Sequence, residues 1–530
     1  MQGNMRDILS SPRSISLVLA ASVLTLSLPH YSRLPVFYFN DLRFDMVSEI
    51  VWYFGVNSTK YSISLREVLS YLRWLPLAIL VMIAIRLAFS KRGIPRSINR
   101  ADGHIGVFLV FALISCWYSI APSISVLRLT SVVLMYGAIF WGIWVIADVV
   151  GQKKVVRVIV NTAAVLFALH ICAAVVDPVG SFPYYGRFEG WMTNPGTVSG
   201  YAASFLPLAL YFALQGPSRR YWFLVASIVL ILIMSQTRTE LLSASIGSLY
   251  FLFSICPKRR LLFLMSVIIL LVSSFVWIEI GPRLFPQGTE FSWNRVLAGV
   301  SERNNISEQT VTNLTDVSSD ISLDSTLIDS NTDSSFADTK VDSSEEINID
   351  RIDRVVVGEE KNILENIRDV DAAVVYQQEN PRVQNITSLS NRTEKWKAGV
   401  QYLLERPLQG FGFGTEHHLF AYHNVRENQY IRTGAYFHNS YLGLALQVGL
   451  VGALLFYVPI GVLLMREMRI TFINPHDHLR VSLLSVVLTN MIAAMASSDL
   501  YSMGNAKALP FWVSIMLLVR YRYGSSVLKK

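Results

Sequence analysis

Four arginines lie in or beside apolar segments of this 530-residue chain, where an unpaired charge is costly. A guanidinium group matches two phosphate oxygens with two parallel N–H donors, so several arginines on one face predict a phosphate or diphosphate ligand. The alternative is that each arginine reaches lipid headgroups or pairs with a carboxylate, and Glu189 and Glu240 are near enough in sequence to serve. The four residues are Arg128, Arg187, Arg238 and Arg392.

A histidine at the start of an apolar segment is a candidate for proton transfer. His438 precedes Asn439 in the run FHNSYLGLALQVGL. An imidazole with its ordinary pKa of about 6.5 can accept a proton from a hydroxyl group at neutral pH. A purely structural histidine is the alternative. Three further histidines, His417, His418 and His423, stand nearby without an HExxH or cysteine pattern, so no metal site is predicted.

The composition of the chain indicates that a membrane positions these side chains. Hydrophobic residues make up 52% of the sequence and charged residues 16%, and three cysteines are present. The charged fraction is well below the roughly 25% of an average soluble protein. These values exclude a disordered, collagen-like or disulfide-rich chain and identify a polytopic membrane protein. The net charge of +8 is not evidence for nucleic-acid binding, because Lys and Arg gather in short clusters between apolar segments.

Twelve apolar segments are long enough to cross a bilayer, which takes roughly 20 residues of helix. The predicted fold class is therefore an all-α integral membrane protein with about twelve transmembrane helices. The predicted spans are residues 14–30, 67–89, 104–120, 124–149, 155–177, 196–214, 221–236, 239–256, 261–280, 440–464, 480–497 and 506–521.

The basic clusters assign the two faces of this twelve-span arrangement. All of them fall on the same side, which the positive-inside rule identifies as the cytoplasm, with both termini inside. The chain is thus predicted to be a multi-pass membrane protein whose candidate site faces the side opposite to the cytoplasm. The clusters are Arg6/Arg13, Lys91–Arg100, Lys153–Arg157, Arg219/Arg220, Lys258–Arg260, Arg466–Arg480 and Arg520–Lys530.

A large outer loop divides the predicted membrane part in two. Residues 1–280 form an N-terminal membrane domain of about nine spans, residues 281–439 form the loop, and residues 440–530 form a C-terminal membrane domain of about three spans. Within the loop, residues 301–350 carry twelve acidic residues against two basic ones, which predicts a disordered insertion. Amphipathic helices are predicted at about 360–377 and 391–406.

The second amphipathic helix carries one of the four arginines. Asn391 is its expected N-cap, with Glu394 completing a capping-box pattern, and Pro407 ends it. Arg392 then lies in the first turn, where backbone N–H groups already attract anions. The apolar face is predicted to contain Trp396, Val400, Leu403 and Leu404. The following GFGFG at 410–414 is interpreted as a turn, because no strand–helix unit surrounds it.

Three segments together resemble the O-antigen ligase and polymerase family of bacterial membrane glycosyltransferases. RFEGWMTNPGTVSG, starting at Arg187, is similar to a family segment in which Gly196 here replaces an asparagine. TRTE at 237–240 is similar to a Ser-Arg-Gly turn, with Thr239 in place of the glycine. The most similar part is NRTEKWKAGVQYLLERPLQGFGFG, followed by FHNSYLGLALQVGLVG.

The resemblance implies a GT-C-like fold that transfers a glycan from an undecaprenyl-diphosphate carrier. The acceptor implied is another glycan or a lipid A-core sugar, and membrane lipids surround the protein. Arg238 and Arg392 are expected to bind the diphosphate, and His438 to act as the base. Arg187, Asn439, Asn194 and Arg128 are the expected substrate-binding residues. No cofactor and no metal are expected.

Two other classes of protein are compatible with a polytopic chain. A flippase or exporter of lipid-linked glycans should carry its charges within the spans, whereas here they gather at the outer mouths. Another GT-C membrane transferase could use an acid of the first outer loop, where Asp41 and Asp45 occur in FNDLRFDM.

Removing residues 301–350 is expected to leave membrane integration and most of the activity intact, because a disordered segment contributes little packing. The measurement compares membrane-fraction yield and glycan transfer of the deletion variant with those of the full chain. A well-expressed deletion variant without any transfer would contradict the prediction.

Overall fold

The computed structural model describes residues 16–21, 24, 43–45, 62–64, 74–88, 98–182, 186–192, 194–216, 218–256, 264–265, 267–274, 276, 392–420, 422–423, 436–501 and 507–523. They belong to one compact unit, in which segments before residue 297 and after residue 390 fold together. The predicted insertion at 301–350, the predicted helix at 360–377, Asn391 and Asp41 lie outside the described residues.

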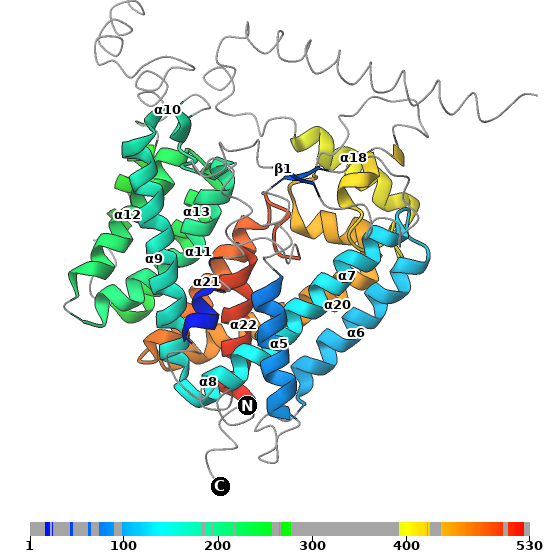
Figure 1. Cartoon of the computed structure of the whole chain (residues 1–530), viewed down its shortest axis with the longest axis horizontal. Coiled ribbons are helices and arrows are strands. Elements are labelled where there is room, and N and C mark those ends of the chain that lie inside the picture. Colours follow the sequence, from blue (N-terminus) through cyan, green and yellow to red (C-terminus); the bar gives the residue numbers. More distant parts are fainter. Residues whose placement is uncertain are drawn as a thin grey trace, which may run out of the picture. The chain divides into compact units, whose positions relative to one another are not determined.

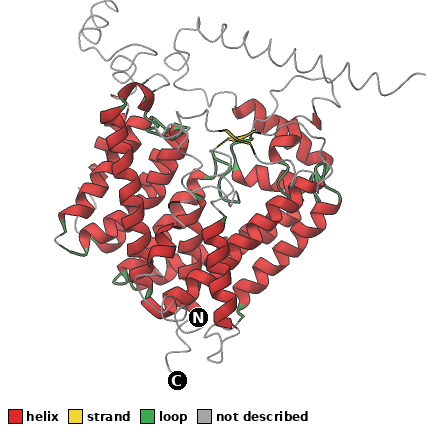
Figure 2. Ribbon diagram, viewed as in Figure 1, coloured by secondary structure: helices red, strands yellow, loops and turns green. Residues whose placement is uncertain are grey.

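The described chain is almost entirely helical (Figure 2). In the N-terminal part, the elements are α5 (Leu75–Ala88), α6 (Arg100–Trp117), α7 (Pro122–Tyr136), the π-helix η3 (Gly137–Ile143), α8 (Trp144–Val150), α9 (Gln152–Val176), α10 (Pro178–Ser181), α11 (Pro195–Leu214), α12 (Arg219–Ser235) and α13 (Arg238–Ile255). After residue 391 come α18 (Arg392–Glu405), the 3-10 turn η6 (Glu416–His418), α20 (Ser440–Ile473), α21 (His478–Ala493) and α22 (Ala508–Tyr523).

Helices occur at ten of the predicted spans, with ends that differ by up to nine residues, whereas the spans predicted at 14–30 and 261–280 are described only in part. Five of the described helical segments are long and apolar enough to cross a membrane: 100–117, 122–150, 152–176, 195–214 and 440–473. The shorter apolar helices 75–85 and 478–493 accompany them. A helical, membrane-embedded chain is therefore confirmed, whereas the count of twelve spans stays a prediction.

Helix α11 lies among α9, α12 and α13 in the bundle (Figure 1). It is apolar on all sides and almost all its side chains are buried, as expected for a helix surrounded by others. It packs against α12, α13 and α21. Its few polar side chains are satisfied internally: Ser204 Oγ donates to the Gly200 carbonyl oxygen at 2.8 Å and to Asn490 Oδ1 at 3.0 Å.

Small residues allow two pairs of helices to approach closely. Between α13 and α21, a Cβ added to Gly247 would lie 1.9 Å from Thr489 Oγ1. Between η3 and α5, a Cβ on Gly142 would lie 2.8 Å from the carbonyl oxygen of Leu80. Lipid tails are as apolar as leucine, so close van der Waals packing of this kind stabilises helix pairs in a membrane.

The long helix α20 is broken at Gly449, where φ is 68°. The segment after α18 fills the break with main-chain hydrogen bonds. The N–H groups of Phe411 and Gly412 donate to the carbonyl oxygens of Leu446 and Gln447 at 2.9 and 2.8 Å. In return, Leu450 N–H donates to the Pro407 carbonyl oxygen at 2.7 Å. The GFGFG segment is therefore a loop that docks on a helix, which agrees with its interpretation as a turn.

The segment before α5 contains a small strand pair that the sequence did not predict. β1 (Arg43–Asp45) pairs antiparallel with β2 (Ser62–Ser64), with Phe44 opposite Ile63. Each strand has three residues, too few for the alternation of apolar and polar residues that indicates a strand.

The helix predicted at 391–406 is present as α18, but its predicted apolar face was partly wrong. Val400 is 49% exposed and Leu404 is 73% exposed. The buried face instead contains Gly399 and Tyr402 beside the half-buried Trp396. The reason is Gly399, which packs against the Phe437 side chain and so rotates the helix away from the pattern that the large apolar residues suggest.

Gly449→Ala is expected to destabilise the protein by about 2 kcal/mol or more, because the new Cβ would meet the Leu408 carbonyl oxygen at 2.1 Å in a backbone conformation that favours glycine. Thermal unfolding in detergent measures the effect. Gly461→Ala is the matched control in the same helix, since its Cβ would meet nothing within 4 Å. It should be neutral or stabilising by up to about 1 kcal/mol. Equal melting temperatures for the two variants would contradict the role given to the break.

Candidate active site

The candidate site lies where α18 begins and where the chain enters α20. Arg392 is the first residue of α18, and its Nη1 donates a hydrogen bond to the carbonyl oxygen of Ala496 at 3.2 Å. One turn later, Trp396 Nε1 donates to the carbonyl oxygen of Phe437 at 2.7 Å. Helix α18 is therefore anchored both to the segment after α21 and to the residue that precedes His438.

His438 stands in a tightly held turn. Its φ is 52°, an uncommon value for a residue other than glycine. The next residue, Asn439, caps α20, since its Oδ1 accepts hydrogen bonds from the N–H groups of Tyr441 and Leu442 at 3.0 and 3.1 Å. Ser440 then donates its N–H to Ala494 at 2.8 Å. These bonds fix the direction in which the imidazole leaves the backbone.

The surroundings of His438 favour the neutral imidazole. Burial first, and then the positive charges of Arg392 and Lys395, lower the pKa of His438 from its ordinary value to about 4. Asp499 opposes the effect and Lys507 adds to it. An imidazole with this pKa is uncharged at neutral pH and has a lone pair available for a proton.

A buried ion pair lies within electrostatic reach of the histidine. Lys507 Nζ donates to Asp499 Oδ2 at 2.9 Å. Burial by itself would lower the pKa of Lys507, but the carboxylates of Asp499 and Glu240 outweigh it and hold the pKa above its ordinary value. Glu240 lies in the first turn of α13 and also interacts electrostatically with Arg392. Charges from α13, α18 and the segment before α22 thus meet in one region.

The turn between α12 and α13 carries two of the predicted arginines. Arg187 Nε donates to the Ser235 carbonyl oxygen at 3.2 Å, at the end of α12. Gln236 follows in the left-handed region with φ of 54°, and α13 begins at the exposed Arg238. Arg187 and Arg238 therefore lie at the same turn, and Glu240 connects this turn electrostatically to Arg392 and Lys507.

A buried carboxylate, Glu416, holds together the segments around the site. It accepts hydrogen bonds from the Phe437 N–H at 3.1 Å, from Ser498 Oγ at 2.7 Å, and from the Tyr501 hydroxyl. Burial raises the pKa of Glu416 to about 7, although these three hydrogen bonds offset part of the effect. The carboxylate thus ties η6 to the residue before His438 and to the segment between α21 and α22.

The other predicted residues occupy separate positions. Arg128 packs over Gly414 and lines a small cavity of about 40 Å³ together with Glu416 and His417. Asn194 caps α11, where its Oδ1 accepts from the Gly196 N–H at 2.7 Å. The geometry therefore brings Arg392, His438 and Asn439 together. Arg187 and Arg238 are related to this group through Glu240. Arg128 and Asn194 do not belong to it.

Three charged residues of this region were missed by sequence reasoning. Lys507 had a detectable signal, because it is a basic residue on the face that the positive-inside rule leaves poor in them. Asp499 precedes Lys507 by eight residues, and Glu416 directly precedes the His417–His418 pair. Among the described residues, no group of three or more His, Cys, Asp or Glu side chains is arranged to hold a metal ion.

Glu416→Gln is expected to change how stability depends on pH. The folded-state pKa of about 7 lies above the ordinary glutamate value of 4.5, so the stability of the native protein falls as pH rises through this interval. Relative to Glu416→Gln, the unsubstituted protein should lose about 3 kcal/mol between pH 4.5 and 8. Thermal unfolding over this pH range measures the difference, with Glu405→Gln at the exposed end of α18 as control. A parallel pH dependence of all three proteins would show that Glu416 does not titrate in this way.

One comparison with known proteins identifies a domain in the chain. Residues 222–457 match the family model described as O-antigen ligase. No curated protein matches the chain. The matched segment contains Arg238, Arg392 and His438, which are the residues that the family resemblance singles out for chemistry. The match confirms the resemblance to the O-antigen ligase family for residues 222–457.

Proposed function

We propose that this protein transfers a glycan from an undecaprenyl-diphosphate-linked donor to a sugar hydroxyl at the outer face of the bacterial cytoplasmic membrane. The match to the O-antigen ligase family supports glycan transfer as the general activity. The observation that carries the proposal is a neutral histidine held beside Arg392 and Lys507. This combination provides a proton acceptor next to cations that suit a diphosphate.

The donor diphosphate binds at the cationic side of this region. Arg392 offers a guanidinium fork at the start of α18, where the helix N-terminus adds further N–H groups. Arg238 contributes from the first turn of α13, and Arg187 is a third candidate contact at the same turn. These cations stabilise the negative charge that develops on the leaving diphosphate.

Donor binding also prepares His438 for its role. Without a ligand, the charges of Arg392 and Lys395 oppose protonation of the imidazole. A bound diphosphate compensates these charges, so the pKa of His438 rises towards its ordinary value when the donor is in place. The base is therefore neutral before the reaction and becomes more basic in the loaded enzyme.

The transfer step is a direct displacement with inversion at the anomeric carbon. The acceptor hydroxyl gives its proton to His438 while its oxygen forms a bond to the anomeric carbon. The bond from that carbon to the diphosphate oxygen breaks, and undecaprenyl diphosphate leaves with the electron pair. Asn439 holds the turn of His438 through its cap on α20. The diphosphate is a good leaving group by itself, and the scheme uses no metal ion.

Polymerase and ligase activities differ only in the acceptor. A second carrier-linked glycan as acceptor gives chain elongation, whereas a lipid A-core sugar gives attachment to lipopolysaccharide. In a strain that lacks the protein, missing chain elongation would identify a polymerase, and complete chains left on their carrier would identify a ligase.

His438→Ala and Arg392→Ala are each expected to reduce transfer from one purified carrier-linked donor at least about 100-fold, because a positioned base and a charge-stabilising donor each supply about this factor. His438→Asn is added because asparagine tolerates a positive φ and so separates loss of the imidazole from a change in the turn. Product formation by the detergent-solubilised full chain is the measurement.

Asp45→Asn, in the first outer loop, tests the competing transferase mechanism and is expected to retain activity. Full transfer by the histidine and arginine variants together with loss in Asp45→Asn would reject the proposal. Glycan accumulating at the inner leaflet of a deletion strain would instead support a flippase or exporter.

A further inference from the structure

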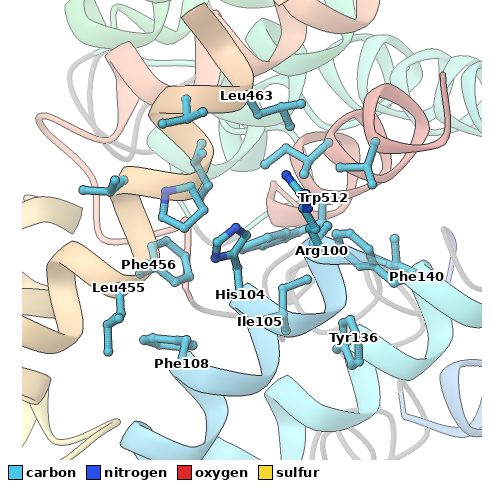
Figure 3. Close-up of a pocket in the computed structure, with 18 of the residues that line it drawn as sticks. Arg100, His104, Ile105, Phe108, Tyr136, Phe140, Leu455, Phe456, Leu463 and Trp512 are labelled. Carbon is cyan, nitrogen blue, oxygen red and sulfur yellow. The ribbon is translucent and has the colours of Figure 1, made fainter. Parts of the chain in front are cut away.

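An apolar groove lies far from the candidate active site, between α6, α20, α22 and the π-helix η3. Its volume is about 460 Å³, within the range of small-molecule sites. The walls consist of aromatic and aliphatic side chains, among them Phe108, Phe140, Phe456 and Trp512. Figure 3 shows Arg100 and His104 of α6 among these apolar side chains. The groove therefore combines an apolar interior with basic groups.

Three arginines from three helices line the groove at one end of the bundle. Arg100 begins α6, Arg466 lies near the end of α20, and Arg522 lies in the last turn of α22. Arg466 is 26 residues beyond Ser440 on α20, roughly 35–40 Å of helix at 1.5 Å per residue, so this end is opposite to His438. It is the end that the positive-inside rule assigns to the cytoplasm.

Among the residues that the structure describes, the basic groups of the groove outnumber the carboxylates beside them. Nη1 of Arg466 is buried and has no hydrogen-bond acceptor among the described residues. Asp102, the nearest acid on α6, is occupied: its Oδ2 accepts the Asn99 N–H at 2.8 Å and its Oδ1 accepts the Tyr136 hydroxyl at 2.5 Å. Glu467 pairs with Arg480 at 2.6 Å. The cationic end of the groove is thus complementary to an added anion.

The groove opens sideways, where a membrane protein meets lipid. Val458 and Val462 of α20 line it and are 52% and 53% exposed. A ligand entering here needs an apolar chain and a negatively charged head. In the proposed function, the diphosphate of the carrier lipid lies at the opposite end of α20, so the carrier does not satisfy both requirements.

We propose that this groove binds an anionic phospholipid of the cytoplasmic leaflet, with one acyl chain between α6, α20 and α22 and the phosphate at Arg100, Arg466 and Arg522. Basic pockets between transmembrane helices on the cytoplasmic side are suited to anionic headgroups. The lipid fills the space between the N-terminal and C-terminal helices of the bundle and thereby connects them.

Native mass spectrometry tests the proposal by measuring how much lipid the delipidated full chain binds. The lipids added are phosphatidylglycerol or phosphatidylcholine with the same acyl chains. Phosphatidylglycerol should bind more tightly, and Arg466→Gln should weaken it about fivefold, the effect of removing one arginine contact with an anionic headgroup. Arg469→Gln is the matched control, because Arg469 lies on the same helix and is exposed outside the groove. It should bind phosphatidylglycerol as the unsubstituted protein does.

Ala101→Phe is the second variant, since Ala101 lines the groove and a larger side chain there occupies the space of the acyl chain. It should reduce binding of both lipids while leaving the melting temperature of the lipid-free protein unchanged. The proposal would be overturned if the two lipids bound equally well, or if Arg466→Gln and Arg469→Gln bound phosphatidylglycerol equally well. Displacement of the bound lipid by inorganic phosphate alone would also overturn it. Stronger binding of undecaprenyl phosphate than of phosphatidylglycerol would overturn it as well, by assigning the groove to the carrier. None of these readouts depends on glycan transfer.

Discussion

The main-chain hydrogen bonds between the break in α20 and the loop after α18 determine how the rest of the site is arranged. A helix in a membrane cannot leave backbone groups unpaired, so an interruption is tolerated only where other protein groups replace the lost bonds. Here Phe411 and Gly412 provide the donors and Pro407 provides the acceptor. The loop that follows carries Glu416, which binds the N–H of Phe437 directly before His438. The glycines of this segment are thus required by packing, and the position of the histidine depends on them.

The protonation states in the site depend on the balance between burial and nearby charges, rather than on any single contact. Lys507 is buried and remains charged because the carboxylates of Asp499 and Glu240 raise its pKa, whereas burial and then the nearby cations lower the pKa of His438 and keep it neutral. These two environments are in reach of one another, and Arg392 interacts with both. An anionic substrate that binds among these cations changes the protonation equilibrium of the histidine without any movement of the chain. In the proposed function, recognition of the donor and activation of His438 as the base are then the same physical event.

The sequence predicted most helices within a few residues, because a membrane span requires a long apolar run that few other structures need. It also singled out Arg238, Arg392 and His438, since polar and charged groups beside apolar segments are conspicuous, and their role in the site stays a prediction. It could not predict that α18 turns Val400 outward, because the close approach of Gly399 to Phe437 depends on residues distant in the chain. The same holds for the pairing of Glu416 with Tyr501 and of Lys507 with Glu240. Contacts between segments far apart in the sequence leave no local pattern.

Two positions in the described chain, Gln236 and His438, have a positive φ without being glycine. Gln236 stands in the turn before the predicted Arg238, and His438 is itself the predicted base. Each positive φ costs of order 1 kcal/mol of backbone strain. A variant library screened only for heat resistance would therefore gain by placing glycine at both positions, and would discard the imidazole in doing so. Thermostable versions of this enzyme are better sought among other residues, with these two turns kept fixed.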